Sequence, residues 1–360
     1  MRFLKRLVSR MRLKTTIFYL KILTIKIHSN IDDKTRKFMT SRFPINVVKF
    51  TPRAQSLCIS LSNGFAIFTL DPLKKKIHRT FDDQSFGSAI SLFDSSITVC
   101  SVNIGSPSVI EKMLCVYNES LGRVVFEVQS PEPIKDIFML NKMFAFATKS
   151  EFRLYSFDPP MLYSQYKTNT NEQTPCDLIE LGESFVLALI GRTPGTVRII
   201  RNDKVDKPDL SISAHSHPIT LLKLNYDGTL VATASSLGTV VKLYNTKTGS
   251  LIGQFRRGTL AAEIQSISFS PGSELLAVSS SKGTIHVFSI SALYSGANEI
   301  RSDMKATCTS LGSPVLCFAS NRLLYAASAS GLIATFTVSE ATKTISCTNT
   351  ESFVDLLTLK

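Results

Sequence analysis

Short runs in which apolar and polar residues alternate follow one another along most of the chain. From Pro44 onward these runs are rich in β-branched and aromatic residues and end in turn residues, and helical periodicity is almost absent. The clearest unit starts at Ile219 and reads ITLLKLNYDGTLVATASSLGTVVKLYNTKTGSLIGQF, with turns at Asp227-Gly228, Leu237-Gly238 and Thr248-Gly249. Three turns separate four runs, so the unit predicts an antiparallel four-stranded meander.

The same unit recurs along the chain. The copy from Ile264 has turns at Pro271-Gly272 and Lys282-Gly283, and weaker copies start near Ile45, Ile90, Ile134, Cys176 and Val315. The seven starts lie roughly 42 to 51 residues apart, which is the period of a WD40-type propeller blade. We therefore expect an all-β fold, in which residues 39–360 form a single WD40-like, seven-bladed β-propeller with four-stranded antiparallel blades. Tryptophan and the WD dipeptide are absent, so the prediction rests on the period.

Residues 1–38 differ from the rest of the chain in charge. They contain eleven Lys and Arg residues and two acidic residues, a net charge of +9, which leaves +4 of the total +13 for residues 39–360. Because the excess is confined to one segment, the whole-chain charge is a weak argument for nucleic-acid binding. Several interpretations of this basic N-terminal extension stay open: a mitochondrial presequence, a basic arm for a membrane surface, a disordered segment, or a stretch that is not translated because Met39 is the true start.

Sequence patterns typical of enzymes and metal sites are absent. The chain contains no G-x-S-x-G, no G-x-x-x-x-G-K, no H-E-x-x-H and, among its seven cysteines, no C-x-x-C. The scattered cysteines are typical of reduced core thiols in a cytosolic protein. The longest apolar runs are shorter than the roughly 20 residues of a membrane-spanning helix. We expect a protein that is not an enzyme and that holds no metal or other cofactor.

The fifth unit ends in Phe255-Arg256-Arg257-Gly258. Successive side chains of an extended strand point to opposite faces, so Arg256 and Arg257 would serve two different sites. Each guanidinium is a planar fork of donors that suits a phosphate dianion. An arginine pair on a solvated edge strand without any ligand is the alternative interpretation.

This motif lies in a longer stretch, residues 214–288, that resembles the PROPPIN family, also called WIPI proteins. The resemblance rests on Ala214-His215, Tyr226-Asp227-Gly228-Thr229, Ala232-Thr233-Ala234-Ser235, Gly238-Thr239, Phe255-Arg256-Arg257-Gly258-Thr259, Phe269-Ser270-Pro271 and Lys282-Gly283-Thr284-Ile285-His286-Val287-Phe288. The other blades match only in period and strand pattern. The resemblance implies a seven-bladed propeller that binds phosphatidylinositol 3-phosphate and phosphatidylinositol 3,5-bisphosphate on autophagic and endolysosomal membranes.

The resemblance also implies the residues of two headgroup sites. The first would contain His215, Ser235, Thr239, Lys242 and Arg256, and the second Arg257, Ser280, Thr284 and His286. Hydroxyl groups can complete hydrogen bonds to phosphate oxygens, and a histidine beside a dianion is biased toward its charged form. His215 also fits the blade-organising histidine of a WD-type unit, and the hydroxyl residues also fit plain strand or turn positions.

The first site departs more from the family pattern than the second. Ser236-Leu237 stand where Asp-Lys are common in relatives, whereas the second site keeps Lys282. A loop of the sixth blade inserts apolar residues into the membrane in the family. It corresponds to about residues 289–308 here, with Leu293 and Tyr294 as candidates, and an ordinary polar loop is the alternative.

Together these features predict a phosphoinositide effector that is monomeric in solution. The resemblance implies a cytoplasmic protein that is peripheral on phagophore (preautophagosomal), endosomal or vacuolar/lysosomal membranes, with partners such as a lipid-transfer protein or a conjugation scaffold. The alternative is a WD40-type scaffold whose arginines dock an acidic peptide without lipid specificity. Nucleic-acid binding through residues 1–38 ranks last, because that arm lacks aromatic stacking platforms interleaved with its basic residues.

Overall fold

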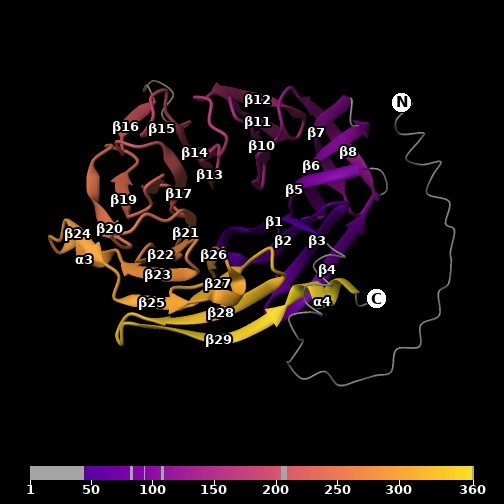
Figure 1. Ribbon diagram of the computed structural model, residues 1–360. Coiled ribbons are helices and arrows are strands. Elements are labelled where there is room, and N and C mark those ends of the chain that lie inside the picture. The colour runs from indigo at the N-terminus through magenta and orange to yellow at the C-terminus, as the bar shows by residue number, and fades with distance from the viewer. Residues whose placement is uncertain (1–43, 82–83, 93, 107–108, 204–208, 359–360) are drawn as a thin grey trace, which may run out of the picture. The chain divides into compact units, whose positions relative to one another are not determined.

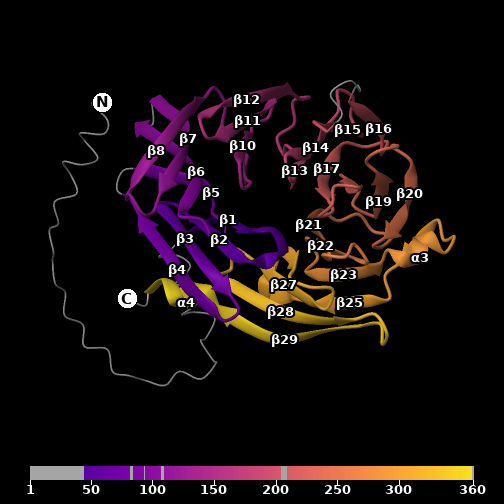
Figure 2. The ribbon, with the colours of Figure 1, turned by 180° about the vertical axis from the view of Figure 1, so that it is seen from behind.

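The computed structural model describes residues 44–81, 84–92, 94–106, 109–203 and 209–358. Within this part of the chain the strands form seven sheets that follow one another around a ring, and each sheet has an antiparallel core of four strands (Figures 1 and 2). The predicted seven-bladed β-propeller is therefore confirmed. The predicted extension of residues 1–38 lies outside the described residues.

The first three blades follow the chain order. Blade one contains β1 (Ile45–Phe50), β2 (Ser56–Leu61), β3 (Gly64–Leu70) and β4 (Leu73–Thr80), with the 3₁₀ turn η1 (Pro52–Ala54) after β1. Blade two contains β5 (Gln84–Ile90), β6 (Ile97–Ser106), β7 (Val109–Asn118) and β8 (Arg123–Ser130). Blade three contains β9 (Asp136–Met139), β10 (Met143–Ala147), β11 (Glu151–Phe157) and β12 (Pro160–Lys167).

The last four blades complete the ring. Blade four contains β13 (Cys176–Leu181), β14 (Ser184–Ile190), β15 (Thr196–Arg201) and β16 (Leu210–Ser213). Blade five contains β17 (Ile219–Leu224), β18 (Leu230–Ser235), β19 (Val240–Asn245) and β20 (Leu251–Arg256). Blade six contains β21 (Ile264–Phe269), β22 (Leu275–Ser280), β23 (Thr284–Ser289) and β25 (Met304–Thr307), with α3 (Ser291–Tyr294) and β24 (Glu299–Arg301) between its last two strands. Blade seven contains the 3₁₀ turn η2 (Thr309–Leu311) before β26 (Val315–Phe318), then β27 (Leu323–Ala327), β28 (Leu332–Ser339) and β29 (Thr344–Ser352), and ends in α4 (Phe353–Thr358).

The second unit begins earlier than the sequence suggests. Its first strand is β5, which ends at Ile90, so the predicted start at Ile90 is wrong. The strand reads QSFGSAI, and its pairing with β6 shifts register between Phe86 and Ala89. Small residues and this bulge interrupt the alternation by which a strand is recognised.

The tight turns of blades five and six follow the glycines that mark them in the sequence, with one exception. Gly238 has φ of 59°, and a Cβ atom there would lie 1.8 Å from the carbonyl oxygen of Ala262. Any larger residue at position 238 would therefore displace the loop that follows β20. At Pro271-Gly272 the left-handed residue is instead Ser273, with φ of 57°.

Packing of side chains, rather than exchange of a strand, closes the ring between blades seven and one. Each of these blades takes its four strands from its own end of the chain. The side chain of Phe353 in α4 is fully buried, and its ring centroid lies 5.8 Å from that of Phe68 in β3. Together with Tyr325 and Leu357 these rings join one hydrophobic cluster shared by both blades.

This closure predicts that Phe353→Ala lowers the free energy of unfolding by about 3–5 kcal/mol, because the change leaves a cavity between the first and last blades. Leu121→Ala is the matched control, since Leu121 is 57% exposed in a turn, and its effect should stay within about 0.5 kcal/mol. Urea denaturation of both variants measures the difference. Equal stability of Phe353→Ala and the wild type would mean that the ring closes without this contact.

Candidate functional site

The Phe-Arg-Arg-Gly motif lies at the end of β20, on the outer side of blade five (Figure 1). Phe255 is fully buried, and its ring centroid lies 5.1 Å from that of Phe288 in β23 of blade six. The side chain of Phe255 therefore faces blade six. Because strand side chains alternate, Gln254 and Arg256 lie on the opposite face of β20.

The register of blade five gathers most of the first predicted site on that opposite face. Thr233 in β18, Lys242 in β19 and Gln254 in β20 lie opposite one another across the sheet. Arg256 is two residues beyond Gln254, and Ser235 is two residues beyond Thr233, so both share the same face. Ser235 is buried, whereas the side chain of Arg256 is 29% exposed.

His215 reaches this group from the segment before β17. Its Nε2 lies 3.0 Å from Oγ1 and 3.2 Å from the carbonyl oxygen of Thr233, while Nζ of Lys242 donates to the carbonyl of Ala214 at 2.9 Å. Burial, and then the positive charge of Lys242, lower the pKa of His215 from 6.5 to about 4. His215 is thus neutral at pH 7 in the structure, unlike the charged form expected beside a bound dianion.

The two remaining predicted residues of the motif region shape its turn. The half-buried Thr239 accepts a hydrogen bond on its carbonyl oxygen from the backbone N–H of Arg257 at 3.0 Å. The guanidinium of Arg257 donates from Nε to the carbonyl of Gly238 at 2.9 Å and from Nη2 to the carbonyl of Leu260. Arg257 is 8% exposed. The two hydrogen bonds to backbone carbonyls hold its guanidinium in one orientation.

The second predicted site lies on one face of blade six. Ser280 and Thr284 have their hydroxyl oxygens 3.2 Å apart across the turn between β22 and β23. His286 is two residues beyond Thr284 and lies opposite Lys305 of β25, so these side chains share a face. The charge of Arg257 also acts on His286, which indicates that this face of blade six looks toward the motif.

In this region, the side chain of His286 has a buried nitrogen atom that lacks a hydrogen-bond partner among the described residues. This atom is Nδ1, and the residue is 5% exposed. Burial, then Lys305, then Arg257 lower its pKa from 6.5 to about 4. A buried polar atom without a partner beside an arginine and a lysine is a place where an anion would be stabilised.

Two residues of the region, Gln254 and Glu299, had no signal in the sequence. Glu299 of β24 binds Arg256, with 2.7 Å from Nε to Oε1 and 2.7 Å from Nη2 to Oε2, and it also accepts from Nε2 of Gln254 at 2.6 Å. Arg301 lies 4.0 Å from the same carboxylate. Glu299 is 43 residues beyond Arg256 in a segment expected to be a loop, so no local pattern could have paired them.

The structure separates the two candidate membrane residues. Tyr294 is 66% exposed, but Leu293 is 5% exposed and packs in the cluster between blades five and six. Leu293 is therefore a core residue here, because α3 turns it onto the backbone of Gly253. Of the two, Tyr294 alone faces solvent.

The described residues contain no group of three or more His, Cys, Asp or Glu side chains that could hold a metal ion. No helix among them has the length and apolarity to cross a bilayer. Burial raises the pKa of Cys58 and Cys317 to about 11 and that of Cys115 to about 12, which keeps these thiols protonated. Cys347 of β29 is exposed, so the expectation of core thiols is wrong for that residue.

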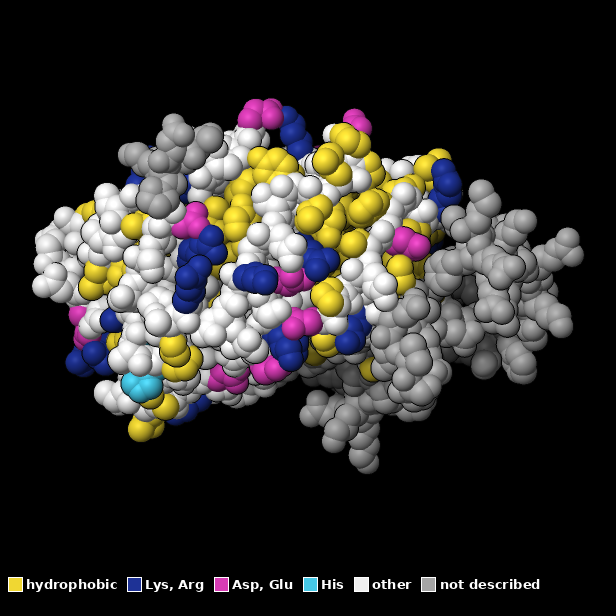
Figure 3. All heavy atoms as spheres, turned by 90° about the horizontal axis from the view of Figure 1, so that it is seen from above, with side chains coloured by type: hydrophobic (Ala, Val, Ile, Leu, Met, Phe, Trp, Pro, Cys, Tyr) yellow, Lys and Arg dark blue, Asp and Glu magenta, His cyan; other side chains and the backbone are white. Residues whose placement is uncertain are grey.

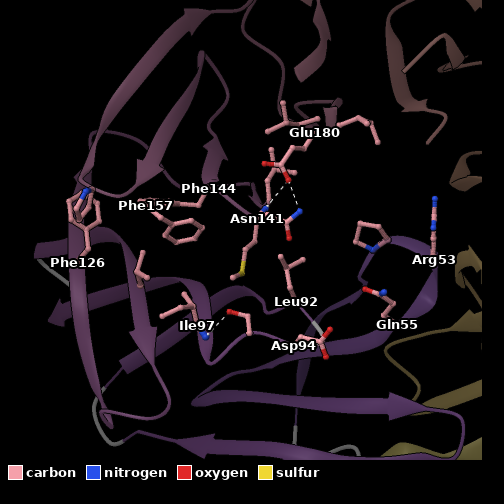
Figure 4. Close-up of a pocket in the computed structure, with 18 of the residues that line it drawn as sticks. Arg53, Gln55, Leu92, Asp94, Ile97, Phe126, Asn141, Phe144, Phe157 and Glu180 are labelled. Atoms are coloured by element: carbon pink, nitrogen blue, oxygen red, sulfur yellow. Dashed lines mark hydrogen bonds between the residues drawn. The ribbon is translucent and has the colours of Figure 1, made fainter. Parts of the chain in front are cut away.

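A separate pocket of about 870 Å³ is lined by residues of blades one to four and by Tyr226 of blade five (Figure 4). Its lining includes the apolar Leu92, Ile97, Phe144 and Phe157, and also Asn141, whose side-chain amide donates to Glu180 at 2.8 Å. Large apolar side chains are also exposed on the outer strands of blades two and three, namely Val125 of β8 and Met161, Leu162 and Tyr163 of β12. Figure 3 shows hydrophobic side chains gathered on the side of the molecule that carries these strands.

Comparison with known proteins gives consistent matches. A family model described as BCAS3, WD40 repeat, matches residues 192–314. SVP1-like protein 2 of Schizosaccharomyces pombe is 29% identical over 257 residues, which cover 71% of this chain and 70% of the relative. Autophagy-related protein 18 of Emericella nidulans is 29% identical over 270 residues, which cover 69% of this chain and 61% of the relative.

Solved structures agree in fold. Kluyveromyces lactis Hsv2 superposes with a TM-score of 0.73 at 19% identity, covering 86% of this chain and 99% of that one. A complex of KlAtg21 with the coiled coil of AgAtg16 gives 0.72 at 18% identity, covering 86% and 99%.

The partly buried His215 and the buried His286 predict a loss of stability in mild acid. Between pH 6.5 and 4 the unfolded chain binds protons at His215 and His286 that the folded chain does not, so the free energy of unfolding falls as the pH falls through this range. Each histidine contributes a slope of up to about 1.4 kcal/mol per pH unit.

Denaturation at pH 7.0, 5.5 and 4.5 of the wild type and His286→Gln measures this effect. The variant should lose less stability than the wild type as the pH falls, whereas His217→Gln, at an exposed histidine, should follow the wild type. Parallel curves for all three proteins would show that His286 stays solvated in the folded state.

Proposed function

Since the chain belongs to the PROPPIN family, we propose that it is a phosphoinositide effector that binds phosphatidylinositol 3-phosphate and phosphatidylinositol 3,5-bisphosphate. The ligands would occupy two rim sites, one on each side of Phe255-Arg256-Arg257-Gly258. The supporting observation is that Arg256 and Arg257 have separate surroundings. Arg256 shares a face with Ser235 and Lys242, whereas Arg257 shares a face with Phe255, whose ring packs against Phe288, the neighbour of His286 in the next blade.

The chemistry of the second group supports a phosphate ligand. Arg257 is fixed by two carbonyls, two hydroxyls lie within reach of each other at Ser280 and Thr284, and His286 has an unused nitrogen. A dianion there would raise the pKa of His286 from about 4 and recruit it as a second cationic donor. Hydroxyl donors satisfy the remaining phosphate oxygens without adding charge.

Two such sites on adjacent blades fit a bilayer better than a soluble ligand. When both headgroups belong to one membrane, binding at one site raises the effective concentration at the other, by factors of roughly 10² to 10⁴. Weak single sites then give firm peripheral attachment. We place the protein in the cytoplasm, on phagophore, endosomal or vacuolar/lysosomal membranes.

Recruitment of autophagy proteins is the second half of the proposal. One relative is named autophagy-related protein 18, and KlAtg21 has been solved with the coiled coil of AgAtg16. Here the pocket of Figure 4 and the exposed apolar side chains of β8 and β12 offer surface for a protein partner on blades one to four. Apart from Tyr226 of blade five, which lines the pocket, they lie on blades other than the one that carries the arginines, so membrane and partner could be held together. The protein itself would act as a non-enzymatic adaptor.

A second candidate function is docking of an acidic peptide without lipid specificity. One observation favours it, because Arg256 already holds a carboxylate, that of Glu299, in a two-point geometry. An acidic segment of another protein could replace Glu299 in the same way. Binding that ignores the phosphorylation state of the lipid would identify this function.

The lipid proposal predicts that the double variant Arg256→Thr/Arg257→Thr loses binding to phosphatidylinositol 3-phosphate liposomes by at least about a hundredfold, since two charge-assisted forks are removed. Liposome sedimentation across a phosphoinositide panel measures the loss, and both single variants show how it divides between the sites. Thermal melts check folding, because Arg257 also bonds two carbonyls.

The matched control is Lys74→Thr/Arg322→Thr, which removes the same charge from exposed positions on blades one and seven. It should bind nearly as well as the wild type. Undiminished capture of the Arg256/Arg257 double variant would refute the lipid sites.

A further inference from the structure

The segment between β23 and β25 of blade six folds back onto blade five. Its strand β24 pairs in parallel with β20, with Gln254 opposite Glu299, Phe255 opposite Ile300 and Arg256 opposite Arg301. Among the described sheets, that of blade five alone has a fifth strand (Figure 1). The strand that carries the first arginine is therefore covered along its edge by a neighbour from the next blade.

Apolar packing and a backbone hydrogen bond hold this segment in place. Leu293 of α3 is buried against Gly253, where a Cβ atom would lie 2.5 Å from Cδ2 of Leu293. Ile290 is 1% exposed, and the backbone N–H of Gln254 donates to the carbonyl of Asn298 at 3.0 Å. Because glycine has no Cβ atom, position 253 leaves space for the side chain of Leu293, and the segment can dock there.

The docked segment places Glu299 on the fork of Arg256. Nε and Nη2 of Arg256 each donate to one carboxylate oxygen at 2.7 Å, which is the planar, two-point arrangement that a phosphate would use. The pair is neutral as a unit, so the first arginine presents little net charge to an incoming anion. Arg257, by contrast, is held by carbonyl groups and keeps its charge.

The contact is accessible to a competitor. The side chains of Arg256 and Glu299 are 29% and 28% exposed, and Arg301, at 78% exposed, lies beside them in register. An ion pair with this exposure is weak, because water competes for both partners. If the carboxylate leaves, Arg256 and Arg301 stand together as two cations for one dianion.

We propose that Glu299 is an internal competitor that occupies the first phosphoinositide site of the free protein and is displaced when a headgroup phosphate binds Arg256. The inference rests on the proposed function and concerns the regulation of that same site. Glu299 raises the amount of phosphorylated lipid that the first site requires, and Arg301 takes part in the site only after the exchange.

The test is Glu299→Gln, which keeps the shape of the side chain and removes its charge. Binding to vesicles containing phosphatidylinositol 3-phosphate should strengthen about two- to fivefold, the range of a partly exposed ion pair. Vesicles without phosphoinositide, and the soluble headgroup inositol 1,3-bisphosphate, are run beside them. Tightening for the soluble headgroup as well would place the effect at the site itself rather than at the membrane surface.

Glu263→Gln is the matched control, since Glu263 is exposed on the neighbouring loop and its loss changes the net charge equally. Equal strengthening by both variants would overturn the proposal, because it would reflect general attraction to an anionic surface. In an Arg256→Thr background, Glu299→Gln should give no gain, and a retained gain would also overturn it.

The outcomes separate the two proposals. If neither the wild type nor Glu299→Gln distinguishes phosphoinositide vesicles from plain ones, the proposed lipid function fails. If the wild type binds the phosphorylated lipid and Glu299→Gln binds it equally, the lipid function stands and the internal competitor is wrong. Thermal melts confirm that the variants are folded.

Discussion

The burial of Phe255 between blades five and six is the constraint on which both candidate sites depend. Its fully buried ring packs 5.1 Å from that of Phe288 and so fixes which face of β20 looks toward blade six. With that face fixed, Arg256 must project from the opposite one, and Arg257 follows Phe255 toward His286. A slip of one residue in the pairing of β20 with β19 would exchange the two faces, and the cost of exposing Phe255 prevents it.

The sequence alone was sufficient for the fold, because each blade repeats the same alternation and turn residues at a nearly constant period. The sequence was insufficient where the local pattern of residues does not determine the structure. In β5, Gly87 and a bulge interrupt the alternation of apolar and polar residues, so the strand could not be recognised. In α3, Leu293 was expected at the surface, but its side chain packs against Gly253 of blade five. The ion pair of Arg256 with Glu299 spans 43 residues and joins two blades, so it follows from tertiary packing and from no motif.

Each of the two candidate sites contains an arginine and a histidine, but the two arginines differ in the groups that bind them. In both, burial keeps a histidine neutral in the absence of an anion, because the same low polarity that strengthens a charge pair penalises a lone charge. The first site balances its arginine with the carboxylate of Glu299. In the second site, the partners of the arginine among the described residues are carbonyl groups, which orient the guanidinium but do not neutralise its charge.

This difference implies an order of events on a membrane under the proposed function. The second site, whose arginine is fixed and uncompensated, would capture the first headgroup, since no internal partner must leave. Capture confines the first site to the bilayer surface, where the local concentration of headgroups far exceeds that in solution. Exchange of Glu299 for a phosphate then becomes favourable although the ion pair would resist a single headgroup from solution. Attachment would therefore respond steeply to the density of phosphorylated lipid, because each protein needs two headgroups and the second is bound only after the first.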